Sequence, residues 1–205
     1  MPMEPVTTDD VLSFWFGDAS ATDPLATAKS KEALWWGGDP ATDRAIDTRF
    51  GAARRLAIAA ELPAWMATPR GRLAAIILVD QFSRNIHRGT PQAFAHDPHA
   101  RNMCHDGLAR GDDTALAPLE RVFFYLPLEH SESIQEQEHS VRLYEQLARQ
   151  AGSDLQTLFE SYADFARRHR DVIRRFGRFP HRNKILGRPS TAEEEAFLAQ
   201  PGSSF

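Results

Sequence analysis

The chain has 205 residues, of which 42% are hydrophobic and 25% charged, and these proportions predict one soluble globular domain spanning residues 1–205. Its single cysteine, Cys104, excludes a disulfide within the chain, and no apolar run approaches the ~18 residues that a membrane span needs. Because the start carries no signal-peptide pattern and the net charge is -4, we expect a cytoplasmic protein that binds neither nucleic acid nor a membrane.

Helix signals run through the whole chain. Asp39, Thr68 and Asp97 each precede a proline, which is typical of an N-cap followed by the first helical residue, and Ser190 with Glu193 matches a capping box. Glycines that fit helix ends stand at positions 17, 37, 89, 107, 152 and 177. Helices are predicted over residues 8–16, 28–36, 40–60, 69–86, 97–109, 114–125, 129–149, 153–176 and 190–199. No strand alternation is present, so the fold class is all-α, and the short connections favour antiparallel helical hairpins.

The predicted helix 69–86 changes character along one face. Leu73 and Ile77 lie on an apolar stripe that continues, at helical spacing, into Asp80 and Arg84. These two side chains are one turn apart and can pair. A core helix therefore ends in groups that need polar partners from elsewhere.

Two further predicted helices carry polar groups on apolar stripes. In 129–149, the stripe that includes Val141 and Tyr144 leads back to Gln137 and His130, and a second face leads back to Glu129, Glu132 and Glu136. In 153–176, His169 interrupts a regular apolar stripe. Because burying such groups without partners costs several kcal/mol each, we expect them to meet one another.

The segment "RRFGRFPHRNKILGR" follows helix 153–176 directly. Residues 167–188 carry nine Lys or Arg against one Asp, a charge of +8, which leaves -12 for the remainder of the chain. We expect this segment to dock on the acidic helix and to bring Arg178, His181, Arg182 and Asn183 over the polar region.

Each feature also has a structural interpretation. Asp80 with Arg84 can be an ordinary helix pair, His130 and His169 can be hydrogen-bonded core residues, and the glutamates can form a solvated face. Glu136 with His139 has the Glu-x-x-His spacing of di-iron bundles, but the chain has no second copy of this pair. His105-Asp106 resembles the His-Asp step of helical metal-dependent phosphohydrolases, but such a dipeptide arises easily by chance. We therefore expect no metal and no cofactor.

Three long motifs, "LVDQFSRNIHRGTPQAF", "FFYLPLEHSESIQEQ" and "RFGRFPHRNKILGRPSTAEE", together with the early "VLSFWFGD", are spread over most of the chain, from residue 11 to residue 194. In this order and spacing they resemble the bacterial family catalogued as domain of unknown function 924. The resemblance implies an all-helical, tetratricopeptide-like fold. It implies no established reaction, ligand or catalytic residue.

The sequence leads to two functional hypotheses. The first is a polar pocket for a small anionic molecule bearing phosphate or carboxylate, in which His130 or His169 is a general base or acid oriented by Asp80. Its anion-binding and lining residues are Gln81, Arg84, Asn85, Arg88, Glu129, Glu132, Gln137, Arg178, His181, Arg182 and Asn183. The second is a protein-interaction module that binds a protein partner and whose polar network only fixes helix register. The sequence leaves open whether the protein is an enzyme and how it oligomerises.

Overall fold

The computed structural model describes residues 5–17 and 23–203, and within these ranges it contains helices and no strand. The α-helices are α1 (Thr8–Phe16), α2 (Pro24–Trp36), α3 (Pro40–Ile58), α4 (Pro63–Met66), α5 (Pro69–Ile76), α6 (Phe82–Ile86), α7 (Asp97–Arg110), α8 (Pro118–Glu129), α9 (Ile134–Gln150), α10 (Ser153–Phe176) and α11 (Ala192–Leu198). Shorter elements are the π-helix η1 (Ile77–Gln81) and the 3-10 turns η2 (Pro91–Ala93), η3 (Asp112–Ala115) and η4 (Pro180–Arg182). The predicted all-α class is confirmed.

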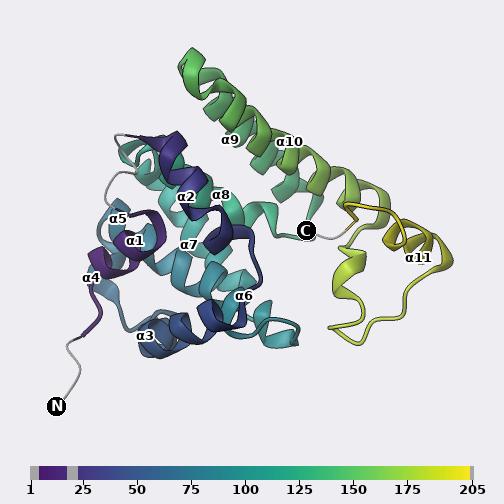
Figure 1. Ribbon diagram of the computed structural model, residues 1–205, viewed down its shortest axis with the longest axis horizontal. Coiled ribbons are helices and arrows are strands. Elements are labelled where there is room, and N and C mark those ends of the chain that lie inside the picture. Colours follow the sequence, from purple (N-terminus) through teal and green to yellow (C-terminus); the bar gives the residue numbers. More distant parts are fainter. Residues whose placement is uncertain (1–4, 18–22, 204–205) are drawn as a thin grey trace.

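Helix α8 lies at the centre of the molecule. Ten of its twelve residues are buried, as expected for a helix that is apolar on nearly every side. It packs against α5, α7, α9 and α10, while α3 packs against α6 (Figure 1). The main hydrophobic core gathers side chains from α1 to α10 around it. None of the described helices combines the length and apolar character that crossing a membrane requires.

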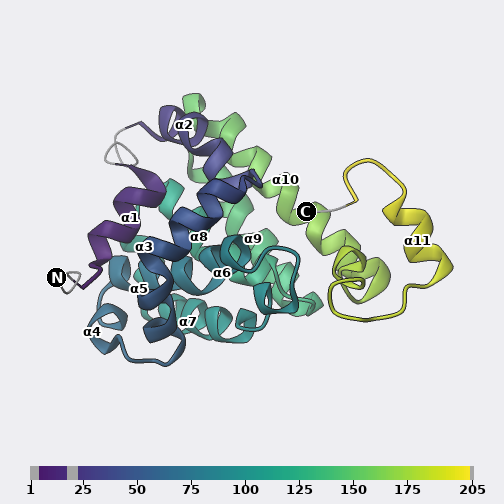
Figure 2. The same ribbon diagram turned by 60° about the horizontal axis from the view of Figure 1, so that its bottom comes forward.

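Helices α9 and α10 form a long antiparallel hairpin along one side of the molecule (Figure 1). The residues that follow, 177–203, are called the C-terminal segment below. A smaller hydrophobic cluster, built on Val172, Ile173 and Phe179, joins this segment to the end of α10. In both views α11 lies at the end of the molecule opposite α1 and α4 (Figure 2).

Several predicted helix ends are confirmed. Asp39 and Thr68 accept hydrogen bonds from the first turns of α3 and α5. The last capping box is shifted by one residue, because it pairs Thr191 with Glu194. Gly107 does not end α7 but lies inside it, where an added Cβ would come within 2.5 Å of the Arg72 and Phe124 side chains. Close packing of α7 on its neighbours therefore explains that glycine.

Other boundaries are wrong, and the errors concern the polar region. Helix 69–86 is interrupted by η1, and the predicted helices 114–125 and 129–149 are α8 and α9, both displaced toward the C-terminus. Pro127 stands within α8 and does not begin a new helix. Consequently Glu129 ends α8, and residues 130–133 form the connection to α9, so these groups do not share the helix faces that the sequence predicted.

Candidate functional site

The π-helix η1 brings Asp80 into the interior. A π-turn adds one residue to a helical turn and often marks a functional site. The Asp80 side chain is 0% exposed, and its Oδ1 atom lies 3.1 Å from Arg84 Nη1 and 2.9 Å from His130 Nδ1. Its Oδ2 atom accepts a hydrogen bond from Gln81 Nε2. Burial alone would raise the pKa of Asp80, but Arg84 and His130 hold it far below its usual range, so the carboxylate is ionised.

His130 follows the last residue of α8 and is oriented by that carboxylate. Burial and the nearby Arg84 lower the pKa of His130, which keeps the imidazole neutral at neutral pH. Because Nδ1 faces a carboxylate oxygen, we assign the proton to Nδ1. Nε2 is then a lone-pair acceptor, and it has no hydrogen-bond partner among the described residues. An Asp-oriented neutral imidazole of this kind can accept a proton.

The ion pairs continue from Asp80 as an alternating row. Arg84 donates to both carboxylate oxygens of Asp97, at 2.9 and 3.1 Å. Arg182 Nη1 lies 3.5 Å from Asp97 Oδ2. Asp80, Arg84, Asp97 and Arg182 are called the charge chain below. Asp97, which the sequence predicted to be an N-cap, makes no capping hydrogen bond and instead forms ion pairs with Arg84 and Arg182.

Arg182 is the least satisfied member of the charge chain. Its residue is only 6% exposed, and its guanidinium lies 4.7 Å from the Phe94 ring centre and 4.5 Å from that of Phe179. Its Nε atom is buried without a hydrogen-bond partner among the described residues. Burial and the neighbouring Arg84 lower the pKa of Arg182 to about 10, still well above neutrality. A buried cation whose donors are largely unused is costly unless something else accepts from it.

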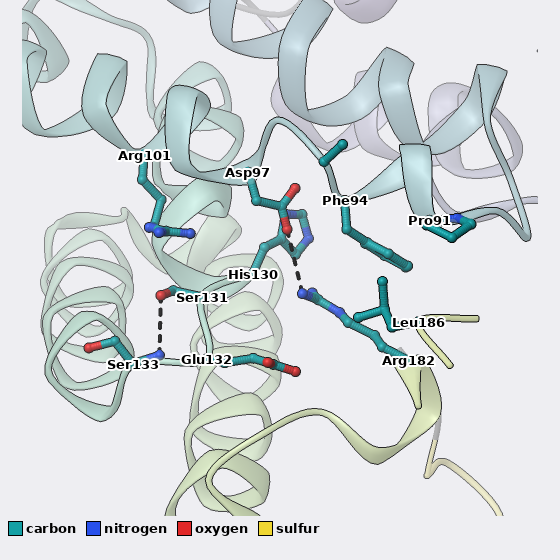
Figure 3. A pocket seen from close by; sticks show the side chains of 11 residues that line it. Pro91, Phe94, Asp97, Arg101, His130, Ser131, Glu132, Ser133, Arg182 and Leu186 are labelled. Carbon is teal, nitrogen blue, oxygen red and sulfur yellow. Dashed lines mark hydrogen bonds and ion pairs between the residues drawn. The ribbon is translucent and has the colours of Figure 1, made fainter. Parts of the chain in front are cut away.

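A cavity of about 480 Å³ opens beside this arginine. In Figure 3, Asp97, His130 and Arg182 lie between Phe94 and Leu186 on one side and Arg101 and Ser131 on the other. The complete lining consists of Pro91, Phe94, Ala95, Asp97, Arg101, His130, Ser131, Glu132, Ser133, Arg182 and Leu186. The volume falls within the usual range of small-molecule sites.

Glu132 connects the C-terminal segment to this wall. Its carboxylate accepts two hydrogen bonds from Arg188, at 2.7 and 3.0 Å, and one from the Phe179 backbone N–H at 2.8 Å. The Arg188 and Phe179 bonds hold in place the stretch of chain that carries Arg182 and Leu186. Docking of the basic segment on acidic side chains, expected from the charge pattern, thus occurs at Glu132 and at Asp97.

A second buried cluster joins Glu129, the residue before His130, to His169 of α10. Glu129 Oε1 is 3.2 Å from His169 Nδ1, which also lies 2.9 Å from the Phe165 carbonyl oxygen. Burial raises the pKa of Glu129 to about 8 and lowers that of His169 to about 3. Both groups are therefore neutral at neutral pH. The Glu129 carboxyl also interacts with the Tyr144 hydroxyl, which donates to the Val122 carbonyl.

His169 does not line the cavity but contacts Phe179, the ring on which Arg182 packs. Its ring meets the Phe179 ring edge to face, with centroids 5.6 Å apart. The Arg182 guanidinium also contacts the Phe179 ring. His181 also packs on Phe179, at 5.5 Å, and burial lowers the pKa of His181 to about 4.

The remaining residues predicted for the site are engaged elsewhere. Asn85 and Arg88 both donate to Asp43 of α3, and neither lines the cavity. Gln137 donates to the backbone carbonyls of Glu129 and Ser131 and thereby fixes the connection that carries His130.

Two predicted residues of the C-terminal segment hold α11. Arg178 and Asn183 both donate to the carboxylate of Glu194 in that helix. Neither appears in the cavity lining.

The histidines and acids whose spacing resembles metal sites lie near one another. His105 Nε2 lies 2.9 Å from Glu136 Oε1, and the rings of His105 and His139 are 6.3 Å apart. Among the described residues, no group of three or more His, Cys, Asp or Glu side chains is placed to hold a metal ion.

Comparison with known proteins gives a family. The family model described as a bacterial protein of unknown function, DUF924, matches residues 11–202. The chain belongs to this family. A solved structure of a protein of unknown function from Agrobacterium tumefaciens is 36% identical to it, with a TM-score of 0.78, and the match covers 94% of this chain and 96% of that one. No curated protein matches the chain.

Several residues that line the cavity of this DUF924 protein were not predicted from the sequence. Asp97 was assigned to a helix cap because it precedes a proline, and Phe94, Arg101 and Ser131 stand on no recognisable stripe. Asp97 and Phe94 do lie within or just after the motif "LVDQFSRNIHRGTPQAF". That proximity was the available signal for them.

Proposed function

We propose that the protein binds a small anionic ligand, bearing carboxylate or phosphate, in the cavity beside Arg182. The observation that carries this proposal is the state of Arg182 itself: it lines the cavity, it is buried against two aromatic rings, and its one carboxylate contact is long. A guanidinium held in this way is already positioned to bind an oxyanion. We place the protein in the cytoplasm, in keeping with its single cysteine.

The residues have distinct proposed roles. Arg182 and Arg101 attract the anion, Arg84 fixes Asp97, and Gln81 with Arg84 fixes Asp80. Asp80 in turn orients His130, whose Nε2 accepts a proton from the ligand or from a water beside it. His169 and Glu129 keep the Phe179 ring in place under Arg182 and remain uncharged.

A thermal-shift screen of small carboxylates and phosphate monoesters, each paired with its neutral amide or alcohol, tests this proposal. We expect at least one anion to raise the melting temperature of the parent protein while its neutral counterpart does not, because binding to the folded state alone stabilises it. Arg182→Gln and His130→Gln should remove the shift. Arg149→Gln, which changes an exposed arginine near the end of α9, should keep it.

Two results would contradict the proposal. One is the absence of any anion-specific shift across the screen. The other is a shift that persists unchanged in Arg182→Gln and His130→Gln.

One observation favours an alternative function, that of a tetratricopeptide-like module for protein partners. Trp36 and Phe165 are large apolar side chains about half exposed, on α2 and α10. Exposed aromatic side chains are common anchors of protein interfaces. Photo-crosslinking in cells from a reactive residue at Phe165 should then yield one reproducible partner, and Trp36→Glu should abolish that product. A diffuse set of weak products would count against the module.

A further inference from the structure

The cavity has two chemically different sides. Asp97, Arg101 and His130 make the polar side, and Phe94 and Leu186, next to Pro91 and Ala95, make the apolar side (Figure 3). At about 480 Å³ it is far larger than one oxyanion group needs, since a water molecule occupies about 30 Å³. A ligand that fills it therefore has a body as well as a charged group, and that body meets aromatic and aliphatic carbon.

The charged groups around the cavity indicate the net charge of the ligand that would balance them. The charge chain contains two carboxylates and two guanidiniums and is balanced. Glu132 is balanced by Arg188. Arg101 lines the cavity without an ion pair to any described residue, and His130 is neutral. The surroundings therefore carry one unbalanced positive charge, which a monoanion neutralises and a dianion overcompensates.

The start of α7, the helix that brings Asp97 and Arg101 to the cavity, is not arranged as a phosphate site. Phosphate is commonly bound by free N–H groups at the start of a helix. The start of α7 adjoins the cavity, but the N–H of Asp97 donates to the Phe94 carbonyl, Pro98 has no N–H, and the next two N–H groups donate to the His96 carbonyl. This helix end therefore offers an incoming phosphate none of its first amides.

We propose that the ligand is a monocarboxylate with an apolar body, its carboxylate on the side of Arg101, His130 and Arg182 and its body against Phe94 and Leu186. This inference rests on the proposed function and narrows it to one class of ligand. It also explains why Leu186 is brought to the cavity by the same stretch of chain as Arg182: one loop then contacts both halves of the ligand.

A matched set of probes tests the class: hexanoate, hexyl phosphate, hexanamide and acetate, each titrated into the full-length protein by calorimetry. We expect hexanoate to bind about tenfold or more tightly than the other three, because only hexanoate combines one negative charge with an apolar chain. Arg101→Gln should reduce hexanoate affinity about tenfold and abolish the preference over hexanamide. Leu186→Asn should weaken hexanoate while leaving acetate unchanged.

Arg101 and Leu186 are only partly buried, so both variants should fold, and circular dichroism checks this. Arg149→Gln is the control for an exposed arginine and should bind as the parent does. Tighter binding of hexyl phosphate that still depends on Arg101 and Arg182 would overturn the carboxylate class and leave the proposed function standing. Equal binding of hexanoate and hexanamide, or no dependence of any probe on either arginine, would overturn both.

Discussion

Arg72 and Arg182 are two buried arginines with different surroundings. They are 4% and 6% exposed. Arg72 donates through Nε to Asp112 at 2.8 Å and through Nη2 to the Met66 carbonyl at 2.7 Å, with Nη1 3.5 Å from the Met103 carbonyl. Arg182 has one carboxylate contact at 3.5 Å, two aromatic faces and an unused Nε. The two arginines are therefore alike in burial and differ in how far their donors are used.

Their places in the fold agree with this difference. Arg72 lies in α5 and joins it to α7 and η3 within the main core. Arg182 lies in the C-terminal segment, beside a cavity, and reaches across to Asp97 in α7. One arginine closes an interface between helices, and the other lines a cavity.

The largest expected effect comes from breaking the satisfied arginine. Arg72→Met should lower the free energy of unfolding by about 3 to 5 kcal/mol, because Asp112 keeps its buried charge and loses its closest cation. Urea denaturation measures this. Arg110→Met is the matched control, since Arg110 faces the same carboxylate at 3.6 Å but is half exposed, and it should cost less than about 1 kcal/mol. Similar losses in both variants would remove the structural role assigned to Arg72.

A buried carboxyl without a cation sharpens the same contrast. Because the pKa of Glu129 in the folded protein is raised to about 8 from 4.5, the folded state holds its proton longer than the unfolded state does. Stability should therefore be lost as the pH rises from 4.5 through about 8. Glu129→Gln removes this titration, so the variant should exceed the parent by an amount that grows with pH, on the order of 3 kcal/mol at pH 9.

Unfolding measured from pH 5 to pH 9 checks that prediction. Glu138→Gln, which changes a partly exposed glutamate that pairs with Arg174, should show no such growth. A parent protein whose stability is flat over this range, or a Glu129→Gln variant that is less stable at pH 9, would show that Glu129 is ionised in the fold.

Local signals in the sequence predicted much of the fold, and non-local packing decided the rest. Caps at Asp39 and Thr68 act over three residues, so they can be recognised without the structure. The predicted helix ended at residue 125, but α8 continues through Pro127 to Glu129 because tertiary packing buries that stretch. The π-turn at Asp80 contacts five neighbouring helices, and no pattern in the sequence predicts it.

The candidate site was predictable only as far as its residue types. Polar groups on apolar stripes correctly indicated that Asp80 and His130 need partners, and these two partner each other. The basic C-terminal segment was expected to bring Arg178 or Arg182 to an acidic side chain of the site, and Arg182 meets Asp97. Arg178 pairs with Glu194 instead, and the contact to Glu132 comes from Arg188, which the sequence did not single out. Which arginine reaches which carboxylate depends on the path of residues 177–191, which spacing along the chain does not specify.

The next prediction concerns how Glu132 holds the C-terminal segment, which carries Arg182, against the helices. Glu132→Gln should weaken the bonds to Arg188 and the Phe179 N–H and lower the free energy of unfolding by about 1 to 2 kcal/mol, because these bonds are charge-assisted and partly buried. Limited proteolysis should also cut the C-terminal segment faster. Glu193→Gln removes an exposed glutamate that pairs with Arg175 and serves as the control. Equal cleavage rates in the two variants would show that Glu132 does not hold the segment.

The smallest effect on stability is expected at Arg182 itself. In Arg182→Met the side chain can still pack between Phe94 and Phe179, and Asp97 keeps both hydrogen bonds from Arg84. The substitution removes a desolvated cation whose donors are largely unused, so the lost contact with Asp97 is offset and the free energy of unfolding should change by less than about 1 kcal/mol. The same variant should lose the anion-dependent thermal shift and the binding of hexanoate, since no neighbouring side chain replaces the guanidinium. Urea denaturation without ligand and calorimetry with hexanoate separate the two effects. A loss of about 3 kcal/mol or more in the free energy of unfolding, with ligand binding intact, would show that Arg182 is a structural arginine like Arg72. Replacing an arginine whose donors hold the fold lowers stability, whereas replacing one whose donors bind a ligand lowers ligand affinity.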